Sequence, residues 1–198
     1  MALTATATPR VQDEIVQNLS LGPGHVTIIS SFDRPNLFYT AMDRSTSDEG
    51  KLVISEIIAK SRMGRAEGVI IYALTQKESE KIANQLTSKG LPRDRVAFYH
   101  AGMADKERTR VHNLFLTDKL HVVVATTAFG MGIDKPDIRH VIHWGAPKTL
   151  ESYYQQSGRA GRDGEGSRCT LLYSEQDFMM GSFYETKGGR DGASLISS

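Results

Sequence analysis

Residues 153–164, with the sequence YYQQSGRAGRDG, bring a predicted helix end, three glycines and two arginines together within twelve positions. Gly161 and Gly164 allow the backbone to turn sharply because they carry no Cβ. We expect Arg159 and Arg162 to be held on this turn, where their planar, permanently charged guanidinium groups suit bidentate contact with phosphate oxygens. The simpler interpretation is a glycine-rich surface turn whose arginines are only solvated.

Outward from this turn, apolar runs alternate with helical patterns. Thr75 and Glu78 form a capping box, Thr149 is a second N-cap, and Gly158 is expected to end its helix in the left-handed conformation. We expect strands near residues 26–30, 69–73, 96–100, 121–125, 139–144 and 168–173, and helices near 9–19, 52–60, 75–90, 105–116, 149–158 and 174–184. Strands separated by helices of roughly ten residues predict an α/β fold with a mostly parallel sheet.

Polar and glycine-bearing turns follow three of the predicted strands. They start at Thr75, span residues 100–103, and span residues 126–134. Ligands of parallel sheets gather at the carboxyl ends of the strands. The sequence therefore predicts a binding site at that edge of the sheet.

Composition limits the classes of protein that fit this chain. It has 198 residues and a formal net charge of +1, so any contact with nucleic acid must come from a local patch rather than from bulk charge. The single cysteine, Cys169, lies in an apolar run and reads as a buried, inert thiol. No apolar run reaches membrane-spanning length, and no signal-peptide pattern is present. We expect a soluble, intracellular protein with no membrane partner.

A second informative stretch covers residues 122–137, VVVATTAFGMGIDKPD. A buried strand here leads into small hydroxyl residues and glycines, which leave backbone N–H groups exposed. Such groups can hold a phosphate. A G-x-G pattern alone is weak evidence, since a plain tight turn would read the same way.

These two stretches together resemble motifs V and VI of the RecQ family of superfamily 2 helicases. The TAT at residues 4–6, SFDRPNL at 31–37 and FYHAGM at 98–103 resemble further segments of that family. The resemblance runs from about Leu3 to Tyr184. It implies a RecA-like three-layer sandwich, with a mostly parallel central sheet and helices on both faces.

The resemblance also implies nucleotide-site residues. In the family the motif VI arginines reach across a cleft to the γ-phosphate of ATP that a partner lobe holds, as arginine fingers. This role falls to Arg159 and Arg162, with Arg162 as the preferred finger. Gln155 would link the turn to the nucleotide or the other lobe, while Asp134 and Gly132 would lie near the nucleotide.

Contacts with the DNA backbone are implied at the other end of motif V and in two further segments. Thr126 and Gly130 would contact the tracked single strand, and Thr75 would donate to a phosphate. Thr75 could equally be only a helix cap. His100 could form a hydrogen bond with a DNA phosphate, although a histidine at a strand end is more often structural. Gln76 stands where the family usually has arginine, which would weaken binding and flatten its salt dependence.

Two ATPase motifs are absent from this sequence. It contains no G-x-x-x-x-G-K-[ST] and no D-E-x-H, so it cannot cradle ATP and Mg²⁺ by itself. It also lacks the four cysteines of the family's zinc module, and we expect no metal ligands. We therefore expect the second motor lobe of a RecQ-type helicase, partnered by DNA and by a first lobe outside this sequence.

Further expectations follow from the same resemblance. Residues 1–24 would be the end of the first lobe, residues 25–185 the helicase lobe, and residues 186–198 a disordered tail. The full enzyme would be an ATP-dependent 3′–5′ DNA helicase of recombination and repair, nuclear in a eukaryotic cell. The isolated chain is expected to be inactive.

Two other functions remain open. One is a non-catalytic module that binds single-stranded DNA or a helicase partner without turnover. The other is a lobe of a DEAD-box-type RNA helicase. That group would show H-R-x-G-R-x-G-R, whereas this chain has QQS at residues 155–157 before its first Gly-Arg pair.

Overall fold

The computed structural model describes residue 2 and residues 9–29, 33–45, 49–62, 67–130 and 132–177. The chain divides into two compact units, Met1–Pro35 and Asn36–Ser198, which are considered separately. The helix predicted after Ser174 begins at residues 175–177, and the rest of it and the predicted tail at residues 186–198 lie outside the described residues.

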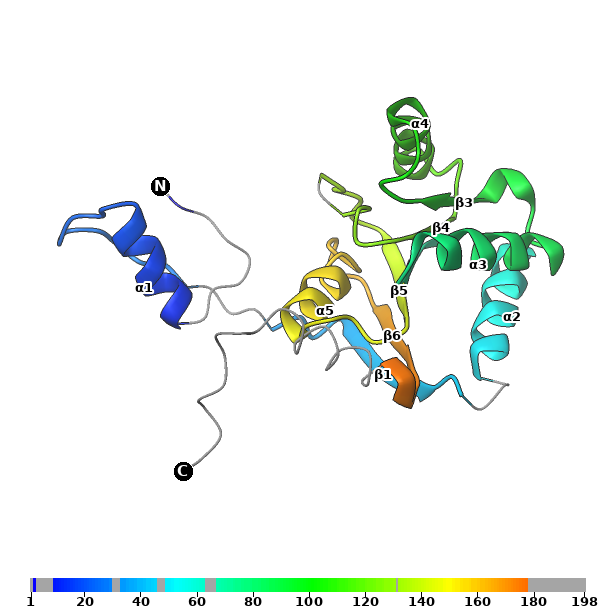
Figure 1. Cartoon of the computed structure of the whole chain (residues 1–198), viewed down its shortest axis with the longest axis horizontal. Helices are drawn as coiled ribbons and strands as arrows, with labels where there is room; N and C mark the ends of the chain where they lie inside the picture. The colour runs from blue at the N-terminus through cyan, green and yellow to red at the C-terminus, as the bar shows by residue number, and fades with distance from the viewer. Residues whose placement is uncertain are drawn as a thin grey trace. The chain divides into compact units, whose positions relative to one another are not determined.

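The first unit contains helix α1 (Pro9–Asn18), blue in Figure 1, which confirms the predicted N-terminal helix. None of its residues is buried. The strand predicted at residues 26–30 is wrong over its described part, because residues 25–29 have no regular secondary structure. The β-branched run there pairs with no strand, so Val26 and Ile28 are more than four-fifths exposed.

The second unit is built on a single six-stranded sheet (Figure 1). Its strands are β1 (Leu37–Asp43), β2 (Gly68–Ala73), β3 (Val96–Tyr99), β4 (Val122–Ala125), β5 (Ile138–Trp144) and β6 (Ser167–Tyr173). Their order is β1-β6-β5-β2-β4-β3, and every neighbouring pair is parallel. The predicted α/β fold with a parallel sheet is confirmed.

Helices cover both faces of this sheet, as the three-layer prediction requires. They are α2 (Glu49–Arg62), α3 (Gln76–Ser88), α4 (Asp105–Leu116) and α5 (Leu150–Ser157), with a 3₁₀ turn η1 (Arg93–Arg95). One buried cluster joins α2 and α3 to the sheet, and a second joins α4 to the opposite face, where α5 also packs against β5.

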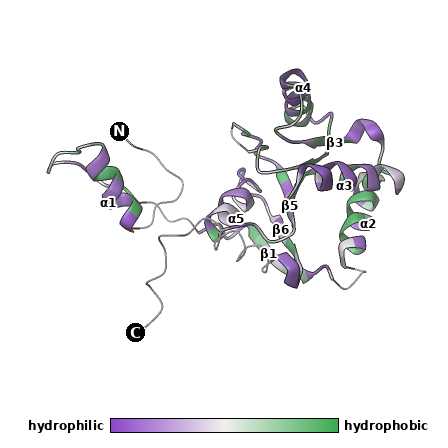
Figure 2. Ribbon diagram, in the orientation of Figure 1, coloured by the Kyte–Doolittle hydropathy of each residue, from purple (hydrophilic) through white to green (hydrophobic). Residues whose placement is uncertain are grey.

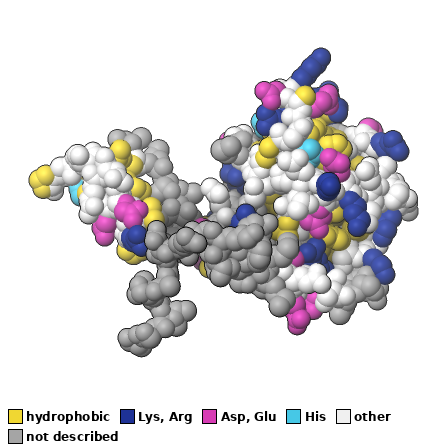
Figure 3. Space-filling view, viewed as in Figure 1, with side chains coloured by type: hydrophobic (Ala, Val, Ile, Leu, Met, Phe, Trp, Pro, Cys, Tyr) yellow, Lys and Arg dark blue, Asp and Glu magenta, His cyan; other side chains and the backbone are white. Residues whose placement is uncertain are grey.

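The distribution of hydrophobic and charged residues fits a sheet buried between helices. Figure 2 shows hydrophobic residues along α2 and the strands, and hydrophilic residues over much of α3 and α4. Figure 3 shows Lys and Arg interspersed with Asp and Glu on the face in view. This pattern agrees with the small net charge of +1.

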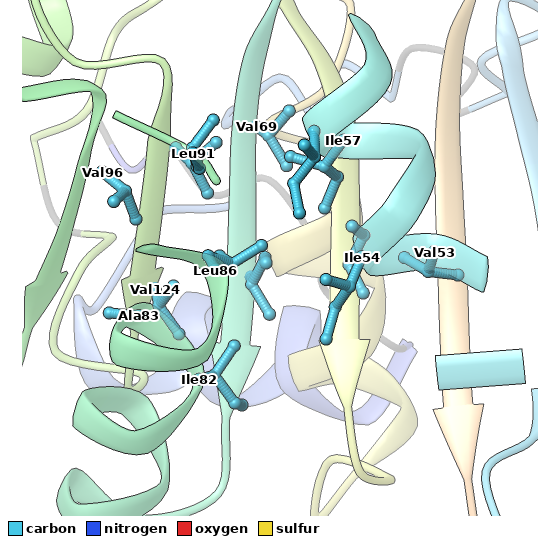
Figure 4. Packing of buried hydrophobic residues seen from close by; sticks show 14 of the residues in the cluster. Val53, Ile54, Ile57, Val69, Ile82, Ala83, Leu86, Leu91, Val96 and Val124 are labelled. Atoms are coloured by element: carbon cyan, nitrogen blue, oxygen red, sulfur yellow. The ribbon is translucent and has the colours of Figure 1, made fainter. Parts of the chain in front are cut away.

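Strand β2 shows how the sequence pattern produces the two cores. Val69 packs with α2 and α3 (Figure 4). Ile71 and Ala73 belong to the same cluster, while Ile70 and Tyr72 belong to the other. Because successive side chains alternate between faces and both faces are covered, the strand must be apolar throughout. Burying each large aliphatic side chain contributes about 1.5–3 kcal/mol.

Helix starts follow the predicted caps closely. The Thr75 hydroxyl oxygen accepts a hydrogen bond from the Glu78 N–H at 3.1 Å, and Thr149 accepts from Ser152 N–H at 3.1 Å. The Glu78 carboxylate accepts from the Leu74 N–H at 3.2 Å rather than from Thr75 itself. The first turn of α3 is therefore satisfied by two side chains, which fixes the loop that precedes it.

Candidate functional site

The chain crosses one face of the sheet without a helix between β4 and β5. These strands are parallel, so residues 126–137 must run from the carboxyl end of one strand to the start of the other. Thr126 lies at the carboxyl edge, whereas Asp134 lies four residues before β5 begins. The prediction that this whole run lies at the carboxyl edge is correct for Thr126 and wrong for Asp134, because the run has to return across the sheet.

This crossover segment (residues 126–137) is fixed to the core by buried groups. The Tyr72 hydroxyl donates to the Phe129 carbonyl at 2.9 Å, and the Phe129 ring packs on Tyr99 with 4.7 Å between ring centroids. Burial raises the pKa of Tyr72 to about 12, although the nearby Arg159 guanidinium acts in the opposite direction. Nearer β5, Lys135 forms ion pairs with Asp118 at 2.6 Å and Asp137 at 2.8 Å.

The first arginine of the predicted turn packs against this segment. Arg159 donates through Nη1 to the Gly130 carbonyl oxygen, and its Nε is buried with no acceptor among the described residues. A Cβ at residue 130 would lie 2.6 Å from Arg159 Nη2. Gly130 is therefore required for the guanidinium to approach the backbone this closely.

The second arginine is more accessible. Arg162 donates through Nη1 to the Ile133 carbonyl at 3.0 Å and to Asp134 Oδ1 at 2.9 Å. Its side chain is 37% exposed and that of Asp134 is 90% exposed. Both bonds use Nη1, and no described residue accepts from Nη2 or Nε, so these N–H groups are open to an incoming oxyanion.

The turn that carries these arginines reverses later than predicted. Gly158 has φ −63° and ψ −3°, so the prediction of a left-handed residue there is wrong. The chain continues in helical bonds through Ala160, whose N–H donates to the Ser157 carbonyl at 3.0 Å. Left-handed residues follow at Gly161 (φ +53°) and Gly164 (φ +88°), which confirms the predicted sharp turns.

The two glutamines before this turn differ in environment. Gln155 is exposed, while Gln156 is buried and accepts a hydrogen bond from His143 Nε2 at 2.9 Å. The His143 ring also stacks on Tyr72, with 5.4 Å between centroids. Burial lowers the pKa of His143 to about 4, so the ring is neutral at pH 7. The pairing was not predictable, because a histidine within a strand carries no positional signal of its partner.

Three predicted residues lie at the carboxyl edge of the sheet. Thr75, His100 and Thr126 follow β2, β3 and β4, which are neighbours in the order β2-β4-β3. Thr75 is exposed and accepts a bond from Glu78, which leaves its hydroxyl hydrogen free to donate outward. Thr126 is half-buried, and its N–H donates to the Tyr99 carbonyl at 3.1 Å.

His100 has a structural environment in this group. It is buried, its Nε2 donates to Glu80 Oε1 at 3.0 Å, and its ring stacks on Phe98 with an interplanar angle of 8°. Its Nδ1 is buried with no partner among the described residues. Gln76 lies close by, since a Cβ at Gly102 would be 2.5 Å from Gln76 Oε1 and 3.2 Å from His100 Nδ1.

Gly132 lies in the exposed middle of the crossover segment. Its φ is +80°, and a Cβ there would meet no atom within 4 Å. Glycine is thus favoured at this position by backbone conformation rather than by crowding.

The part of the chain that the structure describes holds neither a cluster of metal-ligating side chains nor a helix that could span a membrane. No group of three or more His, Cys, Asp or Glu side chains there could hold a metal ion. Among the described helices, none combines the length and apolar composition needed to cross a bilayer. Cys169 is buried, as predicted, and its thiol donates to the Ser157 carbonyl at 3.7 Å.

The sequence of the sheet unit matches a known protein family. The sequence profile described as "Helicase conserved C-terminal domain" matches residues 50–164, more than half of the chain. The chain belongs to this helicase family. The match begins in α2 and ends at Gly164, so it includes both the crossover segment and the arginine turn.

Several curated helicases are similar to this lobe. It is 44% identical over 193 residues to the ATP-dependent DNA helicase Q-like 2 of Arabidopsis thaliana, covering 95% of this chain and 26% of that protein. It is also 44% identical over 183 residues to the ATP-dependent DNA helicase RecQ of Bacillus subtilis, covering 92% and 29%. The predicted kinship with the C-terminal RecA-like lobe of RecQ-family helicases is confirmed. The chain spans between a quarter and a third of the length of these relatives.

Another relative carries a different name. A protein of Acanthamoeba polyphaga mimivirus, named provisionally as an ATP-dependent RNA helicase, is 47% identical over 180 residues and is covered to 31%.

Solved structures agree on the fold. Dbp5 of S. cerevisiae bound to RNA and ADP BeF3 has a TM-score of 0.68 at 19% identity, with 94% of this chain and 48% of that chain covered. A DEAD box protein of Methanococcus jannaschii has a TM-score of 0.62 at 20% identity, with coverage of 91% and 47%. At these identities the comparison establishes a RecA-like fold and nothing finer.

Proposed function

We propose that this chain is the second motor lobe of a RecQ-type ATP-dependent 3′–5′ DNA helicase. In this proposal it supplies arginine fingers to ATP bound by a first lobe and contacts the backbone of one DNA strand. Residues 1–24 would belong to the end of the first lobe and residues 25–185 to the second. The enzyme would act in DNA recombination and repair, in the nucleus of a eukaryotic cell.

The observation that carries the proposal is the state of Arg162. Its guanidinium is part-exposed on a rigid turn and, within the described part of the chain, is engaged through Nη1 alone. Its ionic partner, Asp134, is almost fully exposed, so their pairing in high-dielectric solvent contributes little. A phosphate could therefore replace that carboxylate at small cost and gain a charge-assisted, bidentate contact.

The nucleotide side of the site is assigned to residues around this arginine. Arg162 would neutralise charge that develops on the γ-phosphate, and Arg159 would support it from its position on Gly130. Asp134, Gly132 and Gln155, all exposed, would contact the nucleotide. When bound, ATP would supply the free energy released by hydrolysis of its γ-phosphate. Coordination of Mg²⁺ would fall mainly to the first lobe, as the resemblance to the family implies.

The nucleic-acid side is assigned to the carboxyl edge of the sheet. Thr75 can donate its free hydroxyl hydrogen to a phosphate oxygen, and Thr126 and Gly130 would follow the strand backbone. Thr126 begins the crossover segment and Asp134 lies further along it, so the segment would connect the strand site with the nucleotide site. Movement of that segment on ATP turnover would couple hydrolysis to stepping along DNA.

Arg162 is tested in a chimera in which this chain replaces the matching segment of the Bacillus subtilis relative. Arginine fingers are worth on the order of 10³ to 10⁵ in rate, so Arg162→Ala should lower DNA-stimulated ATP hydrolysis by about 10³-fold or more. The matched control is Arg110→Ala, which removes an exposed arginine on α4. Hydrolysis within a few-fold of the parent chimera after Arg162→Ala would exclude the finger role. The isolated chain should show no DNA-stimulated hydrolysis.

The RNA alternative is favoured by one relative's name and needs its own test. Labelled single-stranded DNA bound to the chimera is competed with DNA and RNA of the same sequence. Preferential competition by DNA is expected, and preferential competition by RNA would favour the RNA helicase alternative. Salt-dependent strand binding with no ATP hydrolysis in any assembly would favour a non-catalytic module.

A further inference from the structure

Asn36 joins the point where the chain enters the sheet unit to the arginine turn. It is the first residue of the second compact unit and directly precedes β1. Its side-chain Nδ2 donates to two carbonyl oxygens of the turn, Gly161 O and Glu165 O, each at 2.9 Å. Its own backbone carbonyl accepts from the Ser167 N–H at 2.9 Å. One residue thus holds both sides of the loop that bears Arg162.

The chemistry of these contacts requires an amide at residue 36. Both partners of the side-chain atom are carbonyl oxygens, which only accept hydrogen bonds. The atom between them must therefore be the NH₂ group, whose two hydrogens satisfy one acceptor each. An aspartate at this position would place an anionic oxygen against two carbonyl dipoles, although its shape is nearly the same.

The turn is shaped to receive this amide. A Cβ at Gly161 would lie 2.6 Å from Asn36 Nδ2 and 2.7 Å from Glu165 O. The Gly161 N–H donates to the Ile138 carbonyl at 2.9 Å, which ties the turn to the start of β5. Arg139 adds a second support through bonds to Asp163 and, at 3.0 Å, to the Ser167 hydroxyl.

We propose that Asn36 is a positioning residue that sets the placement of Arg162 relative to the entry of the chain into this lobe. The proposal rests on the finger role proposed for Arg162. Because Asn36 directly precedes β1, the start of the sheet unit and the arginine turn share one anchor.

The first test examines the turn itself in the isolated chain by hydrogen exchange. Asn36→Ala removes two hydrogen bonds and should speed exchange of the Gly161 and Asp163 amides by about tenfold or more. The Val123 and Val124 amides of the central strand should stay within about twofold of wild type. Asn36→Asp should open the turn at least as much. The matched control is Asn84→Ala, at an exposed site on α3.

The second test measures catalysis in the chimera. A misplacement of about 1 Å can cost about 10²-fold in rate, so Asn36→Ala should lower kcat by about that factor. KM for ATP and the Kd for single-stranded DNA should change by no more than about twofold, because ground-state contacts remain. The rate is expressed per folded molecule, with the folded fraction of the variant measured by circular dichroism. A merely structural role would lower that fraction and Vmax but leave kcat per folded molecule unchanged.

The outcomes separate this proposal from the finger role. Equal acceleration of turn and core amides, or unchanged exchange in the turn, would show that Asn36 does not hold it and would overturn the proposal. A loosened turn with unchanged kcat, in a chimera that needs Arg162, would also overturn it. If Arg162→Ala itself leaves hydrolysis intact, the finger role fails, and with it the claim that Asn36 positions a finger.

Discussion

His140 and His143 lie on the same strand, β5, and face opposite sides of the sheet. His140 Nε2 lies 2.7 Å from the Thr170 hydroxyl, and His143 donates to Gln156. Burial lowers the pKa of each ring to about 4, from an ordinary value of 6.5. Both side chains therefore pack as neutral polar groups at pH 7.

This burial predicts a stability loss in mildly acidic solution. Between about pH 6.5 and pH 4 the unfolded chain binds a proton at each histidine and the folded chain does not, so stability falls as pH falls. Integrating the difference in bound protons from pH 7 to pH 5 gives a loss of about 2 kcal/mol in the free energy of unfolding per histidine. Urea unfolding of wild type, His140→Gln and His143→Gln at both pH values checks this.

Each single variant should lose about half of the pH-dependent change due to the pair. The comparison is His25→Gln, at an exposed site in the first unit. Variants at His140 and His143 that keep the full wild-type dependence would show that these rings do not titrate on unfolding in this range.

Arg44 connects secondary-structure elements, because its bonds link the carboxyl ends of several strands. It follows β1, and its N–H donates to the Tyr173 carbonyl at the end of β6. Its guanidinium pairs with Glu78 at 3.3 Å and with Asp177 at 2.5 Å. The other oxygen of Asp177 accepts from Ser174 N–H at 2.8 Å and from Ala146 N–H, after β5, at 3.3 Å.

Removing Arg44 should leave the Asp177 carboxylate, only 3% exposed, without its cationic partner. Breaking a largely buried pair in this way costs several kcal/mol, so Arg44→Ala should lower the free energy of unfolding by about 2–4 kcal/mol. Arg110→Ala, which breaks an exposed pair with Glu107, should cost less than about 0.5 kcal/mol. Urea unfolding curves measure both. Equal small losses would mean that the Arg44 network adds little to the sheet.

An element could be predicted from the sequence where neighbouring residues alone, such as an apolar run or a helix cap, indicate it. The runs at residues 69–73 and 122–125 are apolar because both faces of the sheet are covered, and helix α3 carries the Thr75 cap, so these elements were predictable. Strand β1 was not predicted: as an edge strand it keeps exposed Phe38 and Tyr39 and lacks that signature. Residues 26–29 have the β-branched signature but no pairing partner.

The candidate site was predictable in residue type and not in contacts. Gly-Arg spacing identified Arg159 and Arg162 as rigid cations. Their partners Gly130 and Asp134 lie about thirty residues earlier and meet them only because β4 and β5 are parallel and the chain must cross the sheet between them. Asn36 lies more than a hundred residues from Gly161, and no local pattern indicates that pairing.

At the scale of the whole molecule, weak charge and nucleic-acid binding have to be reconciled. The net charge is +1, and both signs are interspersed over the described surface in Figure 3. Long-range attraction to a polyanion is therefore small, and under the proposed function affinity would depend on contacts at the carboxyl edge of the sheet. Exposed Gln76, the first residue of α3, occupies that edge without a charge.

A positive charge added at this edge should change the salt dependence of single-strand binding more than the same charge added elsewhere. An arginine at residue 76 can neutralise one phosphate of a bound single strand, which steepens the slope of log K against log salt by about 0.7. Gln76→Arg should therefore bind a labelled single-stranded oligonucleotide more tightly at low salt, and its advantage should shrink as salt rises. Asn84→Arg adds the same net charge two turns along α3, away from the edge, and should leave the slope near that of wild type. If both variants steepen it equally, bulk charge governs binding and the carboxyl edge is not the strand site, because only a local contact distinguishes two positions on one helix.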